Sequence, residues 1–247
     1  MPEMIPKIIH YCWYGNEDNQ SDLIKRCIDS WKRYMPDWKI IKWDESNSDL
    51  KNSEFAISML KQKKYAFVSD YVRLKALEEF GGVYLDTDVE VYKGFDELLN
   101  AEAFWGFMWD CMVSTAVIGA NQFNNNIKKL VKMYEDGTIS NPVVNNEIIT
   151  DFLVTTYPNM KFNNTKQELE NNIYIYPKEY FEFPTKKKNL AYSRHWYNQS
   201  WKKEKSTPKV KRIIRKIVGD PIYFKLNHDI NLVRNSKYYE KYLQDKK

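Results

Sequence analysis

Two aspartates one residue apart, Asp86 and Asp88, follow a short apolar segment, Val83-Tyr84-Leu85. The segment consists of β-prone residues, so we expect a buried strand that ends at the first carboxylate. Two carboxylates at the end of a buried strand are costly unless something neutralises them. A divalent cation that bridges phosphates does so well, and Mg²⁺ and Mn²⁺ accept oxygen ligands. The pattern therefore predicts a metal site that binds a phosphate-bearing ligand.

A second polar pair, Asp70 and Arg73, lies three residues apart, upstream of the strand. Because apolar residues around the pair recur at helical spacing, the two side chains share one face of a helix. One interpretation is an ordinary intrahelical ion pair, worth roughly a few tenths of a kcal/mol. The other is a polar clamp, in which Asp70 accepts hydrogen bonds from sugar hydroxyls and Arg73 neutralises a sugar or phosphate. On these two residues alone the ion pair is the simpler interpretation.

The elements that must position these groups are a helix, a sharp stop and the strand. Gly81-Gly82 ends the helix, because glycine adopts the left-handed backbone conformation without a steric penalty, and it folds Asp70 back toward Asp86. Earlier, Ile5 to Trp13 predicts a strand, Ser21 to Met35 an amphipathic helix and Trp38 to Trp43 a second strand.

Strand, helix and strand in this order indicate a βαβ unit and an α/β fold. Ligands of open α/β sheets bind beyond the carboxyl ends of the strands, so His10, Trp13 and Tyr14 are placed to meet one. Packing in the core is an equally good interpretation of Trp13. Further helices are expected at Glu54 to Lys64, Asn124 to Tyr134 and Asn146 to Tyr157, and strands at Ala103 to Trp109, Met112 to Ile118 and Ile173 to Tyr176.

Composition bounds the class of protein. The chain has 247 residues, and 43% of them are hydrophobic, so it can build a sizeable core. The three cysteines, Cys12, Cys27 and Cys111, have neither zinc spacing nor a disulfide pattern, which favours a reducing compartment. Because neither a signal peptide nor a membrane-spanning stretch is visible, we expect a cytoplasmic protein.

Positive charge is concentrated near the end of the chain. Residues Lys202 to Lys216 carry eight Lys/Arg against one Glu, and we expect residues 1–201 to form the catalytic domain and 202–247 a basic helical extension on or next to it. The basic segment is either a solvated helix or a patch that docks on anionic membrane at the inner face, since apolar residues are interleaved with the cations. Nothing in it supports nucleic-acid binding.

Two stretches carry a family resemblance: I-P-K-I-I-H-Y-C-W-Y-G from Ile5, and S-D-Y-V-R-L-K-A-L-E-E-F-G-G-V-Y-L-D-T-D-V-E-V from Ser69. They resemble glycosyltransferase family 32, which includes bacterial capsular polysaccharide and yeast mannosyl enzymes. The central motif is also similar to that of the catalytic domain of the large clostridial glucosylating toxins. The likeness is strong over residues 4–16 and 65–99 and weaker at His195 and Ser200-Trp201.

The resemblance implies a GT-A-type α/β fold with a mostly parallel sheet flanked by helices. It also implies a retaining, metal-dependent transfer of a hexose or N-acetylhexosamine from a UDP-sugar to a saccharide acceptor, lipid-linked, in surface polysaccharide synthesis. Departure of a nucleoside diphosphate leaves negative charge that Mn²⁺ or Mg²⁺ would stabilise. Since no convincing nucleophile is evident, front-face attack assisted by the leaving phosphate is the favoured mechanism.

The resemblance assigns roles to nine residues. Trp13 would stack on the nucleobase, Asp70 and Arg73 would contact the donor sugar, and Tyr84 would lie alongside. Asp86 would bind the metal and the sugar or ribose, and Asp88 the metal. Three later residues complete the set: Ser200 and Trp201, closing over the diphosphate, and His195, a metal or diphosphate contact or a loop anchor.

Two other classes remain as alternatives. A haloacid-dehalogenase-like phosphatase also has two such aspartates after a strand, but it has Thr or Val two residues after the second, where this chain has Glu90, and its motif opens the chain. A non-catalytic nucleotide-sugar or saccharide-binding protein is the second, and the intact Asp70, Arg73, Asp86 and Asp88 argue against it.

Overall fold

The computed structural model describes residues 4–182, 189–197 and 236–246. Its main sheet has the strand order β2-β1-β3-β7-β5-β9-β8, with β6 paired to β5. The strands are β1 Ile8–Cys12, β2 Lys39–Trp43, β3 Gly82–Leu85, β5 Ala103–Trp109, β6 Met112–Val113, β7 Val117–Ala120, β8 Gln167–Leu169 and β9 Ile173–Tyr176. Strands β1, β2, β3, β5 and β9 run in one direction, and the others run against them. The expected, mostly parallel α/β sheet is therefore present.

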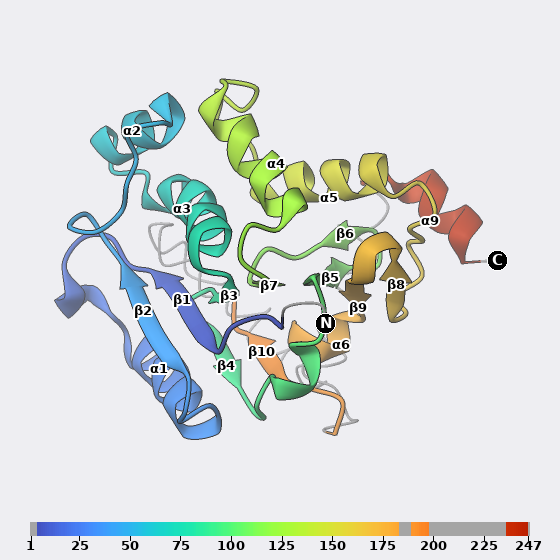
Figure 1. The fold of residues 1–247 in the computed structure, drawn as a ribbon, viewed down its shortest axis with the longest axis horizontal. Helices are drawn as coiled ribbons and strands as arrows, with labels where there is room; N and C mark the ends of the chain where they lie inside the picture. Colours follow the sequence, from blue (N-terminus) through green and yellow to red (C-terminus); the bar gives the residue numbers. More distant parts are fainter. Residues whose placement is uncertain (1–3, 183–188, 198–235, 247) are drawn as a thin grey trace, which may run out of the picture.

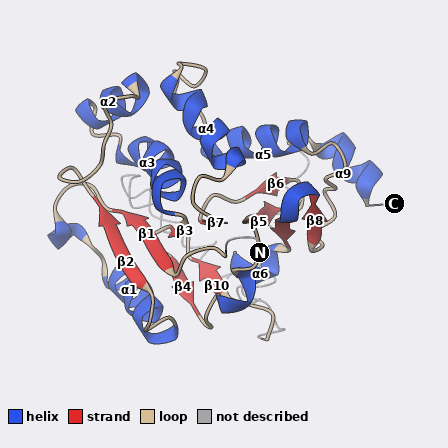
Figure 2. Cartoon of the chain, viewed as in Figure 1, coloured by secondary structure: helices blue, strands red, loops and turns tan. Residues whose placement is uncertain are grey.

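Helices cover both faces of the sheet (Figures 1 and 2). One face carries α2 Glu54–Lys61, α3 Tyr65–Phe80, α4 Asn125–Glu135 and α5 Asn145–Thr156. The other carries α1 Asp22–Tyr34, α6 Lys178–Phe181 and a two-stranded ribbon of β4 Val89–Val91 and β10 Ser193–His195. Short 3₁₀ turns occupy Glu17–Asn19, Asp96–Leu98 and Glu170–Asn172.

Strand β5 shows how one sequence serves both layers. Successive side chains of a strand point to opposite faces, so Trp105 and Phe107 enter the core under α3 to α5, whereas Phe104 enters the core under α1 and α6. Phe104 lies over Gly119 of β7, where an added Cβ would come within 2.0 Å of its ring. The two cores together hold the strand ends in place.

The junction between α3 and β3 reverses the chain within two residues. Gly81 and Gly82 have φ angles of 60° and 105°, in the region that side chains disfavour. A Cβ at Gly82 would also lie 2.5 Å from the carbonyl oxygen of Ile8. The glycine pair therefore lets α3 pack directly against the strand that follows it, as the sequence predicted.

The last described segment packs on the main body. Helix α9, Tyr239–Asp245, buries Tyr242, and a carboxylate oxygen of Asp245 accepts a 2.8 Å hydrogen bond from the amide of Phe162. The basic segment Lys202 to Lys216 and the proposed boundary at residue 201 lie outside the described residues. Among the helices of the described ranges, none has the length and apolar character needed to cross a membrane.

Candidate functional site

The carboxyl ends of β1 and β3 lie side by side, because the two strands are parallel neighbours. Trp13 directly follows β1 and Asp86 directly follows β3, so both lie at the same edge of the sheet. The half-buried indole of Trp13 donates a 3.3 Å hydrogen bond to the carbonyl of Asn16. This is the sheet edge at which ligands of open α/β folds bind.

Two residues expected to face a ligand at the end of β1 belong to the protein interior instead. His10 is fully buried; its Nε2 lies 2.8 Å from the carbonyl oxygen of Gly81, and its Nδ1 accepts a 3.1 Å hydrogen bond from the indole of Trp43. Burial lowers the pKa of His10 to about 4. Tyr14 is buried too, with its hydroxyl 2.8 Å from Ser48 Oγ. Of the three residues, Trp13 alone is partly exposed.

Arg73 connects the helix pair to the first aspartate of the motif. Its guanidinium lies 3.1 Å from an oxygen of Asp70 and 3.3 Å from an oxygen of Asp86. It also donates to the carbonyls of Thr115, at 2.7 Å, and Ser69, at 3.2 Å. The side chain is only 6% exposed, so this is a buried ionic network rather than a surface ion pair. The expected intrahelical ion pair is therefore present, and it extends to Asp86. The contact of Asp70 and Arg73 with a sugar or phosphate stays a prediction.

Tyr84 and Asn145 complete the surroundings of the two carboxylates. Tyr84 and Asp86 lie two residues apart and therefore face the same side, and the tyrosine hydroxyl donates a 3.0 Å hydrogen bond to Asp86. The Arg73 guanidinium lies over the Tyr84 ring, 4.5 Å from its centre. Asn145, the first residue of α5, donates a 3.1 Å hydrogen bond to Asp70. Each carboxylate is thus held by a cation and by a neutral donor.

The charge balance of this cluster appears in its pKa values. Burial raises the pKa of Asp70 to about 6, although Arg73 opposes the rise. The pKa of Asp86 is also raised by burial, again against the effect of Arg73. The pKa of Arg73 is raised, because Asp86, Tyr84 and Asp70 outweigh the loss of hydration on burial. Arg73 therefore offsets part of the cost of burying the carboxylates of Asp70 and Asp86.

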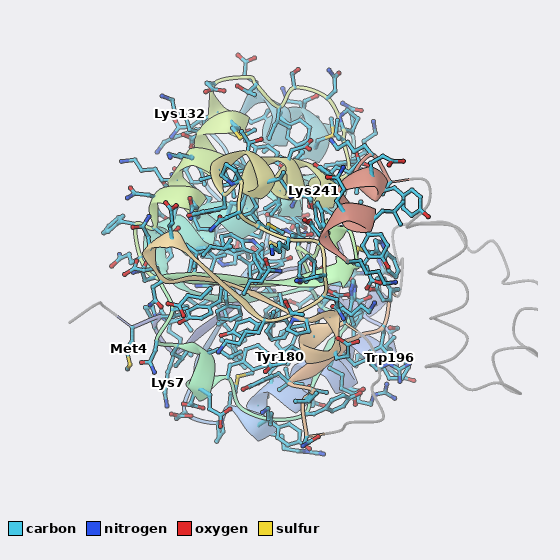
Figure 3. All side chains as sticks on the ribbon, turned by 90° about the vertical axis from the view of Figure 1, so that its right-hand side faces the viewer. Met4, Lys7, Lys132, Tyr180, Trp196 and Lys241 are labelled. Carbon is cyan, nitrogen blue, oxygen red and sulfur yellow. The ribbon has the colours of Figure 1, made fainter. Side chains whose placement is uncertain are left out.

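The β4-β10 ribbon brings a distant histidine to the aspartates. Strand β10 pairs with β4 so that His195 lies opposite Val89, the residue after Asp88. The pairing continues where the amide of Trp196 donates to the carbonyl of Asp88 at 3.0 Å. Trp196 itself is half-buried at the periphery of the side chains in Figure 3. His195 Nε2 is consequently 3.3 Å from an oxygen of Asp88.

Asp86, Asp88 and His195 form a cluster in which one ligand atom from each lies within 4.8 Å of the others. Two carboxylates and an imidazole suit Mn²⁺, and the carboxylates suit Mg²⁺. Neighbouring ligands of an octahedral ion at bond lengths of about 2.1 Å are roughly 3 Å apart, which matches the 3.3 Å between Asp88 and His195. The donor set and its spacing therefore fit a divalent cation.

The other ring nitrogen of His195 faces a buried carboxylate. Nδ1 lies 2.9 Å from Glu182 Oε2, and the Glu182 side chain is fully buried. Burial lowers the pKa of His195, but Asp88 and Glu182 raise it more, so it is well above 6.5. A proton on the imidazole, like a divalent cation, places positive charge next to the Asp88 carboxylate.

Residues 21–105 match the family described as glycosyltransferase sugar-binding region containing DXD motif. The chain is 33% identical over 106 residues to inositol phosphoceramide mannosyltransferase 3 of Schizosaccharomyces pombe, covering 40% of this chain and 29% of that protein. It is 30% identical over 126 residues to mannosyl phosphorylinositol ceramide synthase CSH1 of Saccharomyces cerevisiae, covering 48% and 32%. The chain thus spans about a third of the length of these curated relatives.

Among solved structures, the chain is similar to the PaToxG glycosyltransferase, with a TM-score of 0.51 and 21% identity. The alignment covers 64% of this chain and 71% of that one. This likeness concerns the fold, and it confirms the expected GT-A-type α/β architecture.

The predicted site residues fall into three groups. Five of them are assembled around Arg73 or the aspartate motif, namely Asp70, Tyr84, Asp86, Asp88 and His195. Trp13 lies at the same sheet edge, with its indole bonded to Asn16. Ser200 and Trp201 lie outside the described residues.

Sequence reasoning missed two buried polar contacts of this site, Asn145 and Glu182. The sequence feature that could have indicated Asn145 is the Asn-Asn pair at the start of an apolar helix. The feature that could have indicated Glu182 is a single acidic residue within the aromatic run Y-F-E-F. A charge within such a run is expected to be buried and paired.

Proposed function

We propose that this chain is a glycosyltransferase that moves a hexose, or an N-acetylhexosamine, from a nucleotide sugar to an acceptor. The observation that carries the proposal is the junction of two arrangements at one sheet edge. The Arg73 network holds Asp70 and Asp86, while Asp86, Asp88 and His195 present a ligand set that fits a divalent cation. Residues 21–105, which include Asp70, Arg73 and both aspartates of the motif but not His195, match a glycosyltransferase sugar-binding region.

In this proposal the protein positions charge at the leaving group. A divalent cation held by Asp86, Asp88 and His195 would supply the positive charge that a departing diphosphate needs. Arg73 holds Asp86 in place, and Asp70 accepts hydrogen bonds from hydroxyls of the donor sugar. Trp13, at the same edge, stacks on the nucleobase.

We further propose that the anomeric configuration is retained by front-face attack. The bond from the acceptor oxygen to the anomeric carbon forms on the side where the bond to the phosphate oxygen breaks. The acceptor proton passes to the leaving phosphate, so the sugar passes through an oxocarbenium-like state without a covalent enzyme intermediate. Proton NMR of the first product gives its anomeric configuration, and trapping of a glycosyl-enzyme would exclude this route.

The donor is proposed to be a UDP-sugar, and the names of the curated mannosyltransferase relatives make a mannose nucleotide the second candidate. The inositol phosphoceramide in the name of one relative supports a lipid-linked acceptor here. The proposed place in surface polysaccharide synthesis rests on the sequence resemblance alone. Docking of Lys202 to Lys216 on anionic lipid stays a prediction from the sequence. Flotation with anionic liposomes at low salt tests it, with neutral liposomes as the control.

A donor panel tests the proposed function. UDP-glucose, UDP-galactose, their N-acetyl forms and GDP-mannose are each incubated with the protein and Mn²⁺, and release of the nucleoside diphosphate is measured. We expect release from one donor class and its loss in Asp88→Asn. Phosphate release from phosphomonoesters without release from any donor would instead indicate the phosphatase. Donor binding without any release would indicate the non-catalytic binding protein.

A further inference from the structure

Glu182 is a carboxylate that the proposed chemistry does not itself use. It follows α6 directly, and its side chain is fully buried. An ionised carboxylate in such a place needs hydrogen-bond donors that replace its lost hydration. Three side chains supply them, since Ser114 Oγ donates to Oε1, Tyr197 donates to Oε2 at 2.6 Å, and His195 Nδ1 lies 2.9 Å from Oε2.

The contact with His195 sets the tautomer of the ring. An ionised carboxylate can only accept, so Nδ1 of His195 carries the hydrogen of this bond. Nε2 then points toward Asp88 Oδ1, 3.3 Å away. The Tyr197 ring also stacks on the imidazole at 4.1 Å between centres, which restricts its rotation. Nε2 is therefore aimed at the cluster of aspartate oxygens.

The other carboxylate oxygen of Glu182 bonds to the segment between β6 and β7, which contacts the backbone of Asp86. Ser114 Oγ donates to Glu182 and accepts a 3.1 Å hydrogen bond from the amide of Ala116. The carbonyl of Ala116 accepts a 2.9 Å hydrogen bond from the amide of Asp86. A continuous path of hydrogen bonds therefore runs from the backbone of Asp86 to the ring of His195, with Glu182 at its centre.

We propose that Glu182 is the positioning residue for the cation site, holding His195 so that Nε2 and the aspartate oxygens converge on one ion. Its negative charge also makes Nε2 a more basic ligand. Carboxylates behind metal-binding histidines act in this way, and their loss weakens metal binding roughly 10- to 100-fold. The inference rests on the proposed function only in the assignment of the cation site.

The test uses Glu182→Gln in the full chain. Glutamine has nearly the same shape as glutamate, and its amide oxygen can still accept a hydrogen bond from His195 while its NH₂ group faces Ser114. The variant therefore removes the negative charge with little change in packing. Mn²⁺ is titrated alone and with UDP or GDP, and free Mn²⁺ is measured by electron paramagnetic resonance. We expect the dissociation constant to rise about 10- to 100-fold. Glu179→Gln, on the short helix α6 that directly precedes Glu182 and bonded to Asn164, is the matched control and should change the dissociation constant less than about twofold.

A double-mutant cycle separates positioning from a general structural effect. If Glu182 acts through the ring, Glu182→Gln causes no further loss of Mn²⁺ affinity in a His195→Ala background. Equal affinity of wild type and Glu182→Gln would overturn the inference, as would a loss of the same size in both backgrounds. Glu182→Asp, which keeps the charge on a shorter side chain, should recover part of the affinity.

The same titration distinguishes this inference from the proposed function. If Mn²⁺ binding depends on Glu182 but no donor in the panel releases its nucleotide, the positioning role of Glu182 stands. The proposed transferase activity is then excluded. If the wild-type protein transfers sugar but binds no Mn²⁺, the proposed transferase activity stands. The positioning role of Glu182 is then overturned.

Discussion

Two buried ionic clusters meet at the proposed cation site, and they are built in opposite ways. In the Arg73 cluster, one cation lies among anions and a phenol, the residues being Asp70, Arg73, Tyr84 and Asp86. In the Glu182 cluster, one anion accepts from neutral or protonated donors, the residues being Ser114, Glu182, His195 and Tyr197. The Arg73 cluster contributes a ligand oxygen of Asp86, next to the positive charge of Arg73. The Glu182 cluster contributes a ligand nitrogen of His195, next to the negative charge of Glu182.

The two clusters act on the cation site in different ways. A carboxylate ligand is already negative, so the Arg73 cluster limits repulsion between Asp70 and Asp86 while they share a buried region. A histidine ligand is neutral when it binds metal, so the Glu182 cluster adds the charge that strengthens it. Loss of the central residue should therefore threaten folding in the first cluster and metal affinity in the second.

The largest expected effect is that of Arg73→Met. The change leaves Asp70 and Asp86 without their buried counter-charge, and we expect a loss of about 3–5 kcal/mol in the free energy of unfolding. Urea denaturation followed by tryptophan fluorescence measures it. Lys75→Met on the same helix removes partly exposed ion pairs with Glu78 and Glu135 and should cost less than about 1 kcal/mol. Equal losses in the two variants would contradict the central role of Arg73.

The two ligands should differ when each is removed. Asp86→Asn removes a charged ligand, and we expect nucleotide release to fall about 1,000-fold, since stabilisation of the leaving group is lost. His195→Gln removes a neutral ligand, and we expect a loss roughly 10-fold smaller, because less charge is lost. Steady-state rates at saturating Mn²⁺ measure both. Asp136→Asn, at an exposed turn, is the control. A larger loss in His195→Gln would reverse the proposed division of tasks.

His10 separates the effect of burial from that of neighbouring carboxylates. His10 is fully buried, whereas the His195 side chain is 13% exposed. The ring partners of His10 are the Gly81 carbonyl and the Trp43 indole, and the cation Lys39 also disfavours its protonation. Its folded-state pKa of about 4 lies below the unfolded value of 6.5, so the unfolded state binds the proton first as pH falls.

The stability that His10 contributes is therefore complete above pH 6.5 and is lost as pH falls toward 4, by about 3 kcal/mol. Urea unfolding at a series of pH values tests this, by comparison with His10→Gln, whose side chain does not titrate. The difference in free energy of unfolding between the two proteins should shrink across this range. A constant difference would refute the assignment.

The smallest expected effects come from the two tyrosines that donate to the clusters. Tyr84→Phe removes a bond to the ligand Asp86 itself, and we expect Mn²⁺ affinity to fall about fivefold, or roughly 1 kcal/mol. Tyr197→Phe removes a bond to Glu182, one step behind His195, and should cost less than about twofold. Mn²⁺ titration of both variants measures the two losses of affinity. A larger loss in Tyr197→Phe would show that Mn²⁺ binding depends more on the Glu182 cluster.

How far the sequence predicted this site depends on how local each contact is. Helical spacing predicted the pair Asp70 and Arg73, and the Gly81-Gly82 turn predicted that Asp70 folds back toward Asp86. The contacts of Asp86 with Arg73 and Tyr84 were not predicted. Most of the longer helices and strands were anticipated from local periodicity, with ends shifted by a few residues, as for α2, which ends at Lys61 rather than Lys64. The single strand expected from Met112 to Ile118 was wrong, because the structure has two strands there, β6 and β7.

The Glu182 cluster could not be predicted in this way. Strand β10 has three residues, S-R-H, without an alternating apolar pattern, and its partner β4 is a distant V-E-V segment. Strand β8 and helix α6 are equally short and were not anticipated. Pairing of such segments is decided by tertiary contacts rather than by local propensity. His10 was misplaced for a related reason, since its orientation depends on Trp43 in the neighbouring strand.

The β4-β10 ribbon has a consequence for the order of folding. Trp196 bonds to Glu90 across 106 positions of sequence, and the ribbon that carries His195 forms by this long-range closure. Closing so long a loop costs conformational entropy before its contacts compensate, and contacts of this range slow folding. During synthesis the aspartates leave the ribosome long before their histidine does. The cation site is therefore complete only after the β4-β10 ribbon has closed, and metal binding would report that closure.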